Sequence, residues 1–230
     1  MRDHPNALML FAAGFGTRMG ALTAHQPKPL IKVAGKALID HTLDLAKAVQ
    51  PNPIVANLHY HTNQLQDHLA PLGVQAIVEQ PDILETGGGL RNALSVLGDG
   101  PVYTSNTDAI WKGPNPFEIL KAAWKPEIMD ALLLCVPCEN TVGHAGKGDF
   151  ILGPDGTLTR GPGAVYGGIQ ILKTDGLAHI KDTAFSLNLL WNEISAAGRL
   201  FGVIYSGKWC DVGTPEGITL AENMLENSNV

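Results

Sequence analysis

The first half of the chain alternates continuous apolar runs with amphipathic segments, and this alternation constrains the fold more than any other feature. Residues 7–13 form an unbroken apolar run, which is typical of a strand covered on both faces. Residues 38–49 repeat apolar side chains at helical spacing and so predict a helix buried along one face. Further strands are predicted within 51–60, 74–80 and 101–108, and further helices within 61–73 and 88–98. This repetition predicts an α/β fold with a doubly wound, mainly parallel sheet.

The second half of the chain favours more β-structure. The expected elements are a hairpin at 149–160, a strand at 164–172, a helix at 186–198, two short strands within 200–217 and a closing helix at 215–226. No internal repeat or linker separates the halves. We therefore expect one domain over residues 1–230, with an α/β half up to about residue 112 and a more β-rich half from about residue 113.

Two local signals add detail to this pattern. Thr62 is the expected N-cap of the helix at 61–73, and Gly73 is its expected stop.

Ligands of doubly wound sheets bind beyond the carboxyl ends of the strands. The loops expected at that edge are residues 13–30, 80–89, 105–112 and 207–214.

Composition excludes several classes of protein. The formal net charge is −6, which argues against a protein that coats nucleic acid. Only three cysteines occur, so we expect no disulfide framework and a reducing, cytoplasmic compartment. No apolar run reaches the length of a membrane span, so we expect no membrane partner.

The loop after the first predicted strand, "AAGFGTRMG", limits the class of ligand that the chain is expected to bind. A dinucleotide fingerprint needs a third glycine where Met19 stands, and the Walker pattern is absent. What is left is a small-residue turn whose backbone amides can face a phosphate chain. Arg18 adds a bidentate phosphate donor, and Lys28 stands between two prolines that stiffen the backbone. A glycine turn with two cations favours a nucleoside triphosphate.

Four motifs, in this order along the chain, resemble the sugar-1-phosphate nucleotidyltransferases. They are "AAGFGTRM" followed by "PKPL", "LETGGGL" at 84–90, "SNTDAIW" at 105–111 and "WCDVGTPE" at 209–216. The subgroup that the chain most resembles is the N-acetylmuramate-1-phosphate uridylyltransferases. The resemblance implies a Rossmann-like fold of the nucleotide-diphospho-sugar transferase type, with a β-rich sugar-binding insertion. It also implies the transfer of a nucleotide from a triphosphate, with UTP favoured, to an amino-sugar 1-phosphate, with release of pyrophosphate.

The resemblance also implies roles for particular residues. Arg18 and Lys28 would be catalytic, and Asp108 and Asp211 would hold Mg²⁺ as the cofactor. The nucleotide-binding residues would be Ala13, Gly14, Gly16, Thr17, Gln80, Glu85, Thr86 and Gly87. The sugar-binding residues would be Asn106, Gly148, Tyr166 and Gly168. Thr107 departs from the family pattern, which commonly has glycine there, and is expected to crowd the metal loop.

The chemistry agrees with this set of residues. A phosphate monoester has a second pKa of about 6, so the attacking phosphate needs no general base at neutral pH. The barrier comes from repulsion between negative charges, which cations and positioning relieve. Mg²⁺ suits two carboxylates completed by phosphate oxygens and waters.

Other interpretations stay open. Guanylyl, cytidylyl or thymidylyl transfer to another hexose 1-phosphate is one, and a non-catalytic nucleotide-sugar sensor on the same fold is another. An NAD(P)-dependent oxidoreductase is a third, against which the missing third glycine argues. The sequence leaves the oligomeric state open.

Overall fold

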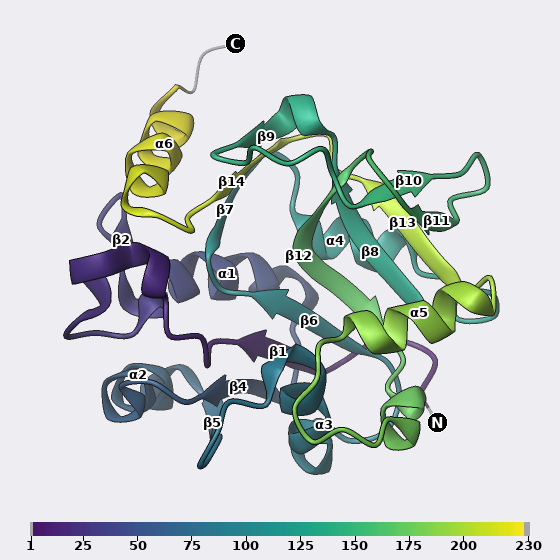
Figure 1. The fold of residues 1–230 in the computed structure, drawn as a ribbon, viewed down its shortest axis with the longest axis horizontal. Coiled ribbons are helices and arrows are strands. Elements are labelled where there is room, and N and C mark those ends of the chain that lie inside the picture. The colour runs from purple at the N-terminus through teal and green to yellow at the C-terminus, as the bar shows by residue number, and fades with distance from the viewer. Residues whose placement is uncertain (1, 228–230) are drawn as a thin grey trace.

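A seven-stranded sheet forms the centre of the computed structural model, which describes residues 2–227 (Figure 1). In spatial order its strands are β13 (Leu200–Ile204), β8 (Ala131–Val136), β12 (Val165–Leu172), β6 (Val102–Asn106), β1 (Leu8–Phe11), β4 (Ile54–Leu58) and β5 (Val74–Val78). All neighbours are parallel except β12, which runs antiparallel to both β6 and β8. The predicted mainly parallel α/β sheet is therefore confirmed, and both halves of the chain contribute strands to it.

Helices cover both faces of this sheet. They are α1 (Leu38–Ala46), α2 (Thr62–Leu69), α3 (Glu85–Leu97), α4 (Pro116–Ala123) and α5 (Asn188–Ala196), whereas α6 (Pro215–Glu226) packs elsewhere. Side chains of α1, α2 and α4 share one buried cluster with Leu8 and Leu10 of β1. Side chains of α3 and α5 share the other cluster with Met9. Because successive residues of a strand point to opposite faces, the continuous apolar run of β1 serves both layers.

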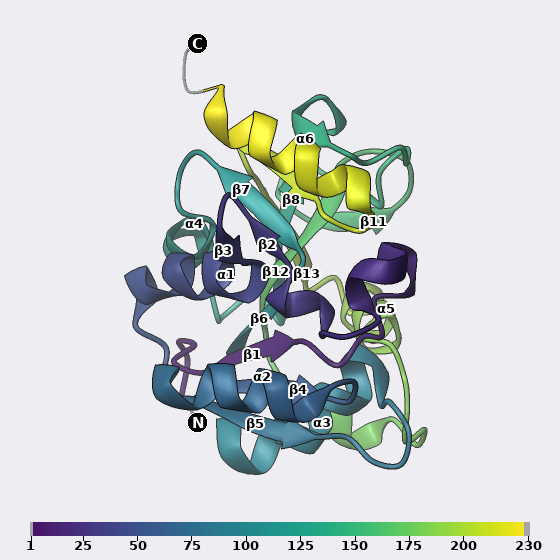
Figure 2. The same cartoon turned by 90° about the vertical axis from the view of Figure 1, so that its left-hand side faces the viewer.

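A second, smaller sheet stands beside the main one. It contains β7 (Ala109–Lys112), β14 (Lys208–Asp211) and β9 (Thr141–Val142), with β14 antiparallel to β7. Helix α6 packs on β14 and β7 through Ala221 and Met224, and Figure 2 shows it lying across them. Two hairpins complete the fold: β2 (Lys32–Val33) with β3 (Lys36–Ala37), and β10 (Phe150–Leu152) with β11 (Leu158–Arg160).

Three local features differ from the sequence predictions. Thr62 is not a helix cap, because α2 begins at Thr62 itself and His61 holds the cap position at φ 48°. Strand β7 and helix α4 were not predicted. The sequence did contain a signal for α4, namely an asparagine followed by a proline, which are preferred at the start of a helix. In the structure Asn115 accepts hydrogen bonds from two backbone N–H groups, and Pro116 occupies the first turn.

Among the described residues, no helix combines the length and apolarity that crossing a membrane requires.

Candidate active site

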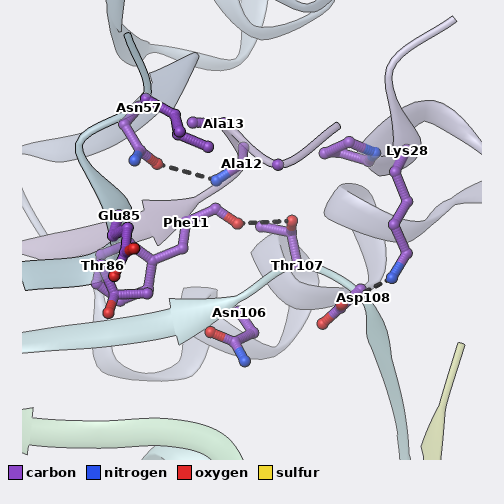
Figure 3. A pocket seen from close by; sticks show the side chains of 13 residues that line it. Phe11, Ala12, Ala13, Lys28, Asn57, Glu85, Thr86, Asn106, Thr107 and Asp108 are labelled. Carbon is purple, nitrogen blue, oxygen red and sulfur yellow. Dashed lines mark hydrogen bonds and ion pairs between the residues drawn. The ribbon is translucent and has the colours of Figure 1, made fainter. Parts of the chain in front are cut away.

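A pocket opens where β1, β4 and β6 end, at the carboxyl edge of the main sheet (Figure 3). Ala13 and Gly14 line it from the loop after β1, and Glu85 and Thr86 line it from the start of α3. Its other lining residues are Phe11, Ala12, Lys28, Pro29, Asn57, Ile83, Asn106, Thr107 and Asp108. The structure thus brings three of the four predicted loops to one place, as the topology of a doubly wound sheet requires.

Gly16 decides where Lys28 lies. Its φ of +64° favours glycine, and a Cβ atom there would lie 2.9 Å from Lys28 Cβ and 2.9 Å from Thr23 Cγ2. The loop can therefore pack against the stem of Lys28 only because residue 16 has no side chain. Lys28 is 9% exposed, with buried prolines on both sides. This packing holds an ammonium group at the floor of the pocket.

Two aspartates from distant segments meet near this ammonium. Lys28 Nζ lies 2.7 Å from Asp108 Oδ2, an ion pair that Figure 3 shows. The antiparallel pairing of β7 with β14 places Asp211 opposite Ala109, next to Asp108 in the chain. The N–H of Val212 donates to the carbonyl oxygen of Asp108 at 2.9 Å and fixes this register.

The pKa of Asp211 reflects its burial and its closeness to Asp108. Burial raises the pKa of Asp211 above its ordinary value, and the neighbouring Asp108 carboxylate raises it further. The positive charges of Lys28 and Arg18, together with His144, offset part of this rise. Two carboxylates that repel each other in this way can be stabilised by a divalent cation between them. No group of three or more His, Cys, Asp or Glu side chains that could hold a metal ion occurs among the described residues.

Arg18 approaches the same corner from the other side. Its side chain is exposed, and its guanidinium packs on Gly213, where a Cβ atom would lie 2.9 Å from both Nη1 and Nη2. Thr17 begins the short 3-10 helix Thr17–Thr23 that carries Arg18. Neither Arg18 nor Thr17 lines the pocket, but the charge of Arg18 acts on Asp211.

A buried polar network that sequence reasoning missed connects the strands behind the pocket. Asn57 Oδ1 accepts from the N–H of Ala12 at 2.9 Å, and Asn57 Nδ2 donates to Glu79 Oε1 at 2.7 Å. Glu79 Oε2 then accepts from the N–H of Leu84 at 2.8 Å, just before α3. Glu79 is 1% exposed. The sequence signal was a polar residue at the end of each of two otherwise apolar strand runs.

Thr107 and Glu85 take defined positions at the pocket. Thr107 Oγ1 donates to the carbonyl oxygen of Phe11 at 3.0 Å and is 3% exposed. It ties the loop after β6 to the end of β1 and does not face the two aspartates as an obstruction. Glu85 begins α3 with a φ of 58°, a conformation that non-glycine residues seldom adopt.

Gly16 and Thr17, expected to bind the nucleotide, do not line the pocket, and neither do Gln80 and Gly87. Gln80 lies in a separate hollow with His59, Glu79 and Pro81. Gly87 is buried against Phe185, whose Cε2 would lie 2.3 Å from a Cβ atom at position 87. Glycine is required there because the segment around Phe185 caps α3, with Phe185 O accepting from the N–H groups of Gly87 and Gly88.

A second pocket adjoins the first, and Phe11, Thr86 and Asn106 line both. Tyr166 lines the second pocket, and so do Asp149, Phe150, Arg160, Gln170, Ser186, Leu187, Asn188 and Trp191. Gly148 and Gly168 do not line it. A Cβ atom would lie 2.0 Å from Gly163 O at position 148 and 3.0 Å from Asn106 Nδ2 at position 168, so each glycine allows close backbone packing.

Comparisons with known proteins place this geometry in a family. Residues 8–145 match the family described as the MobA-like NTP transferase domain. The chain is 39% identical to N-acetylmuramate alpha-1-phosphate uridylyltransferase of Caulobacter vibrioides, over 98% of this chain and 99% of that protein. It is 33% identical to the protein of the same name from Neisseria meningitidis, over 90% of this chain and 92% of the relative. The crystal structure of HddC from Yersinia pseudotuberculosis, complexed with GMP-PN, has the same fold, with a TM-score of 0.77 at 19% identity over 96% of this chain and 99% of that one.

Proposed function

The chain belongs to the MobA-like NTP transferase family, and from this premise we propose that it is a sugar-1-phosphate nucleotidyltransferase. The favoured substrates are UTP and N-acetylmuramate 1-phosphate, and the products are the nucleotide-sugar and pyrophosphate. The observation that carries the proposal is the meeting of Lys28 and Asp108, which line one pocket, with Asp211, which strand pairing places next to Asp108. The identity of 39% with a muramate uridylyltransferase over nearly the full length supports the choice of substrates.

The nucleophile in this reaction is an oxygen of the sugar phosphate. It attacks the α-phosphorus of the nucleotide, a new P–O bond forms, and the bond to pyrophosphate breaks on the opposite side. Because the monoester is largely a dianion at neutral pH, no side chain has to remove a proton. The protein lowers the barrier by orienting two anions and compensating their charge.

Lys28 and Arg18 supply positive charge at two points. Lys28 lies at the floor of the pocket beside Asp108, where it can contact the α-phosphate or the incoming sugar phosphate. Arg18 lies on the loop whose Gly16 packs against Lys28. Its guanidinium can bind the leaving β- and γ-phosphates through two hydrogen bonds. The backbone of Ala13 and Gly14 borders the path between them.

We further propose that Asp108 and Asp211 would hold Mg²⁺. The repulsion that raises the pKa of Asp211 is the physical reason why this pair fits a divalent cation. When bound, the ion supplies Lewis-acid stabilisation of charge on the phosphate oxygens. Asp108 also keeps Lys28 in place through their ion pair.

The remaining assignments follow from the two adjoining pockets. We propose that the nucleotide occupies the first pocket between the loop after β1 and the start of α3, within the half of the domain up to about residue 112. The sugar would occupy the second pocket, with Asn106 between them because it lines both. UTP and a wall-derived amino-sugar phosphate imply a cytoplasmic enzyme of cell-wall recycling.

The test is pyrophosphate release in the presence of Mg²⁺. Five nucleoside triphosphates are crossed with a panel of sugar 1-phosphates that includes N-acetylmuramate 1-phosphate, and Asp108→Asn serves as the control. Release with UTP and the muramate substrate, lost in the variant, is the expected result. Release with another base or sugar would redirect the substrate assignment. No release with any pair, while UTP still binds, would favour a nucleotide-sugar sensor.

A further inference from the structure

Arg160 is the most unusual side chain of the second pocket. It ends strand β11, and its guanidinium carbon lies 4.5 Å from the centre of the Phe150 ring and 5.4 Å from that of Trp191. Cross-strand pairing of Arg160 with Phe150 in the β10–β11 hairpin places the guanidinium over the ring. The aromatic faces leave the N–H groups at the edge of the guanidinium plane available for hydrogen bonds.

The surface beneath Arg160 is anchored in the core. Trp191 donates its indole N–H to Gln170 Oε1 at 2.9 Å, and Gln170 is 0% exposed. Tyr166 packs edge-on against Trp191, with ring centres 5.0 Å apart. An arginine held on such a platform loses little further side-chain entropy when a ligand binds, which is the property of a prepared recognition group.

The charge of Arg160 has no ion-pair partner within 4.0 Å among residues 2–227. Its hydrogen-bond partner is the neutral side-chain oxygen of Asn188, the first residue of α5. Asp149, the other charged residue of the pocket, accepts a hydrogen bond from the N–H of Tyr166 at 2.9 Å. Arg160 and the N-terminus of the nine-residue helix α5 therefore both present positive charge to the same side of the pocket.

We propose that Arg160 recognises a carboxylate on the sugar 1-phosphate, at the end of the sugar away from the phosphate. The inference rests on the proposed function and makes Arg160 a specificity-determining residue. The planar, two-oxygen carboxylate matches the edge of the guanidinium in a bidentate contact. Muramic acid differs from glucosamine by one ether-linked lactate, which carries such a carboxylate.

The arrangement of the two pockets agrees with this assignment. They meet at Phe11, Thr86 and Asn106, while Lys28 and Asp108 line only the first and Arg160 lines only the second. A sugar lying across the junction directs its phosphate to Lys28 and its far substituents to Arg160. The acidic substituent then distinguishes the substrate at a point that takes no part in bond formation.

The experiment compares two sugars that differ in this lactate alone. The ratio of kcat/KM for N-acetylmuramate 1-phosphate to that for N-acetylglucosamine 1-phosphate is measured with UTP for wild type and Arg160→Gln. We expect the ratio to fall about 10- to 100-fold in the variant, because a charge-assisted hydrogen-bond pair is lost. Arg160→Lys retains the charge without the fork and should recover part of the ratio.

Two further variants keep the test sharp if Arg160→Gln is poorly folded. Arg91→Gln removes an arginine that stacks on Phe185, 4.8 Å from the ring centre, outside both pockets, and is expected to leave the ratio unchanged. Asp149→Asn removes the negative charge of the second pocket and should raise the ratio. Calorimetric titration with N-acetylmuramate 1-phosphate gives a readout that is independent of turnover, and Arg160→Gln should weaken binding by a similar factor.

The possible outcomes separate the two proposals. A wild-type protein that uses both sugars, with a ratio that neither Arg160→Gln nor Asp149→Asn changes, overturns the role of Arg160 and leaves the nucleotidyltransferase intact. A wild-type protein that releases no pyrophosphate with any pair of the full panel overturns the proposed function, whereas release only with sugars other than N-acetylmuramate 1-phosphate overturns the role of Arg160 and leaves the nucleotidyltransferase intact. An equal loss on both sugars in Arg160→Gln assigns this residue to holding the hairpin.

Discussion

The two edges of the main sheet use aspartate in opposite ways. At the carboxyl edge, Asp108 and Asp211 crowd each other, and burial together with this repulsion raises the pKa of Asp211. At the other edge, Asp130 precedes β8 and pairs with Lys173 at 2.9 Å and with Arg199 at 2.7 Å. Burial acts to raise the pKa of Asp130, but the hydrogen bonds from Arg199 and Lys173 outweigh it and the net shift is downward.

The difference shows which edge is built for stability and which for a ligand. The cations around Asp130 also bond to main-chain oxygens, Lys173 to Pro126 O at 2.8 Å and Arg199 to Glu127 O at 3.2 Å. Both carboxylate oxygens of Asp130 are thus paired with cations of the chain. Asp211, in contrast, has no ion-pair partner within 4.0 Å among residues 2–227, and its raised pKa means that its ionised form costs stability at neutral pH. Functional sites commonly carry such a cost.

Removing a carboxylate from the carboxyl edge tests the comparison most severely. We expect Asp108→Asn to lower kcat/KM for pyrophosphate release by about 10³-fold, because this removes the charge that pairs with Lys28 and that we propose as a ligand of Mg²⁺. Asp130→Asn is the matched control and should keep kcat/KM within about twofold of wild type, as expected for a substitution away from the chemistry. Similar losses of kcat/KM in both variants would mean that the carboxyl edge matters no more for activity than the opposite edge.

The glycine that positions Lys28 offers a second test at the same edge. Gly16→Ala should lower the free energy of unfolding by about 1–3 kcal/mol, because a Cβ atom at positive φ would press on Lys28 and Thr23. Gly14→Ala is its control, since no atom lies within 4 Å of a Cβ there and its φ is outside the positive region. Chemical denaturation should place Gly14→Ala within about 0.5 kcal/mol of wild type. Equal destabilisation would show that the packing on Lys28 does not restrict residue 16.

Asp130 provides the test at the opposite edge. A lowered pKa in the folded state contributes stability above the unfolded pKa of about 3.9, and this is lost as the pH falls through the folded value. Asp130→Asn should therefore cost about 1 kcal/mol, or about 2–4 °C in Tm, between pH 5 and 8. Thermal unfolding across pH 3 to 8 should show this deficit shrinking below about pH 4. A deficit that stays constant down to pH 3 would point to lost packing and not to lost charge.

Asp211→Asn should give the smallest effect, with the opposite sign. A raised pKa in the folded state means that stability is full below the unfolded pKa and is lost as the pH rises through the folded value. In metal-free protein we expect the variant to gain up to about 1 kcal/mol at neutral pH and little below about pH 4. Thermal unfolding with a chelator measures the gain, and added Mg²⁺ should stabilise wild type more than the variant. A variant less stable than wild type at pH 7 without metal would contradict the repulsion.

The sequence by itself determined the class of fold and much of the first pocket. The apolar runs with strand length, alternating with helical patterns, were sufficient for the sheet because burial on two faces requires that pattern. The sequence predicted a small-residue turn and a Lys28 stiffened by flanking prolines, and in the structure Gly16 of this turn has a positive φ and packs against Lys28. Which base and which sugar bind stays a prediction from these motifs.

Only the tertiary structure decided the contacts between segments far apart in the chain. The antiparallel place of β12 between β6 and β8 could not be predicted, because a strand has the same period of two in either direction. Gln80 lies in a hollow apart from the first pocket, and Gly87 lies against Phe185 because α3 docks on the segment 183–188. Arg160 reached the second pocket through a hairpin whose orientation depends on packing against Trp191. Pattern and backbone preference act over a few residues, whereas the approach of distant side chains is set by the packing of the whole core.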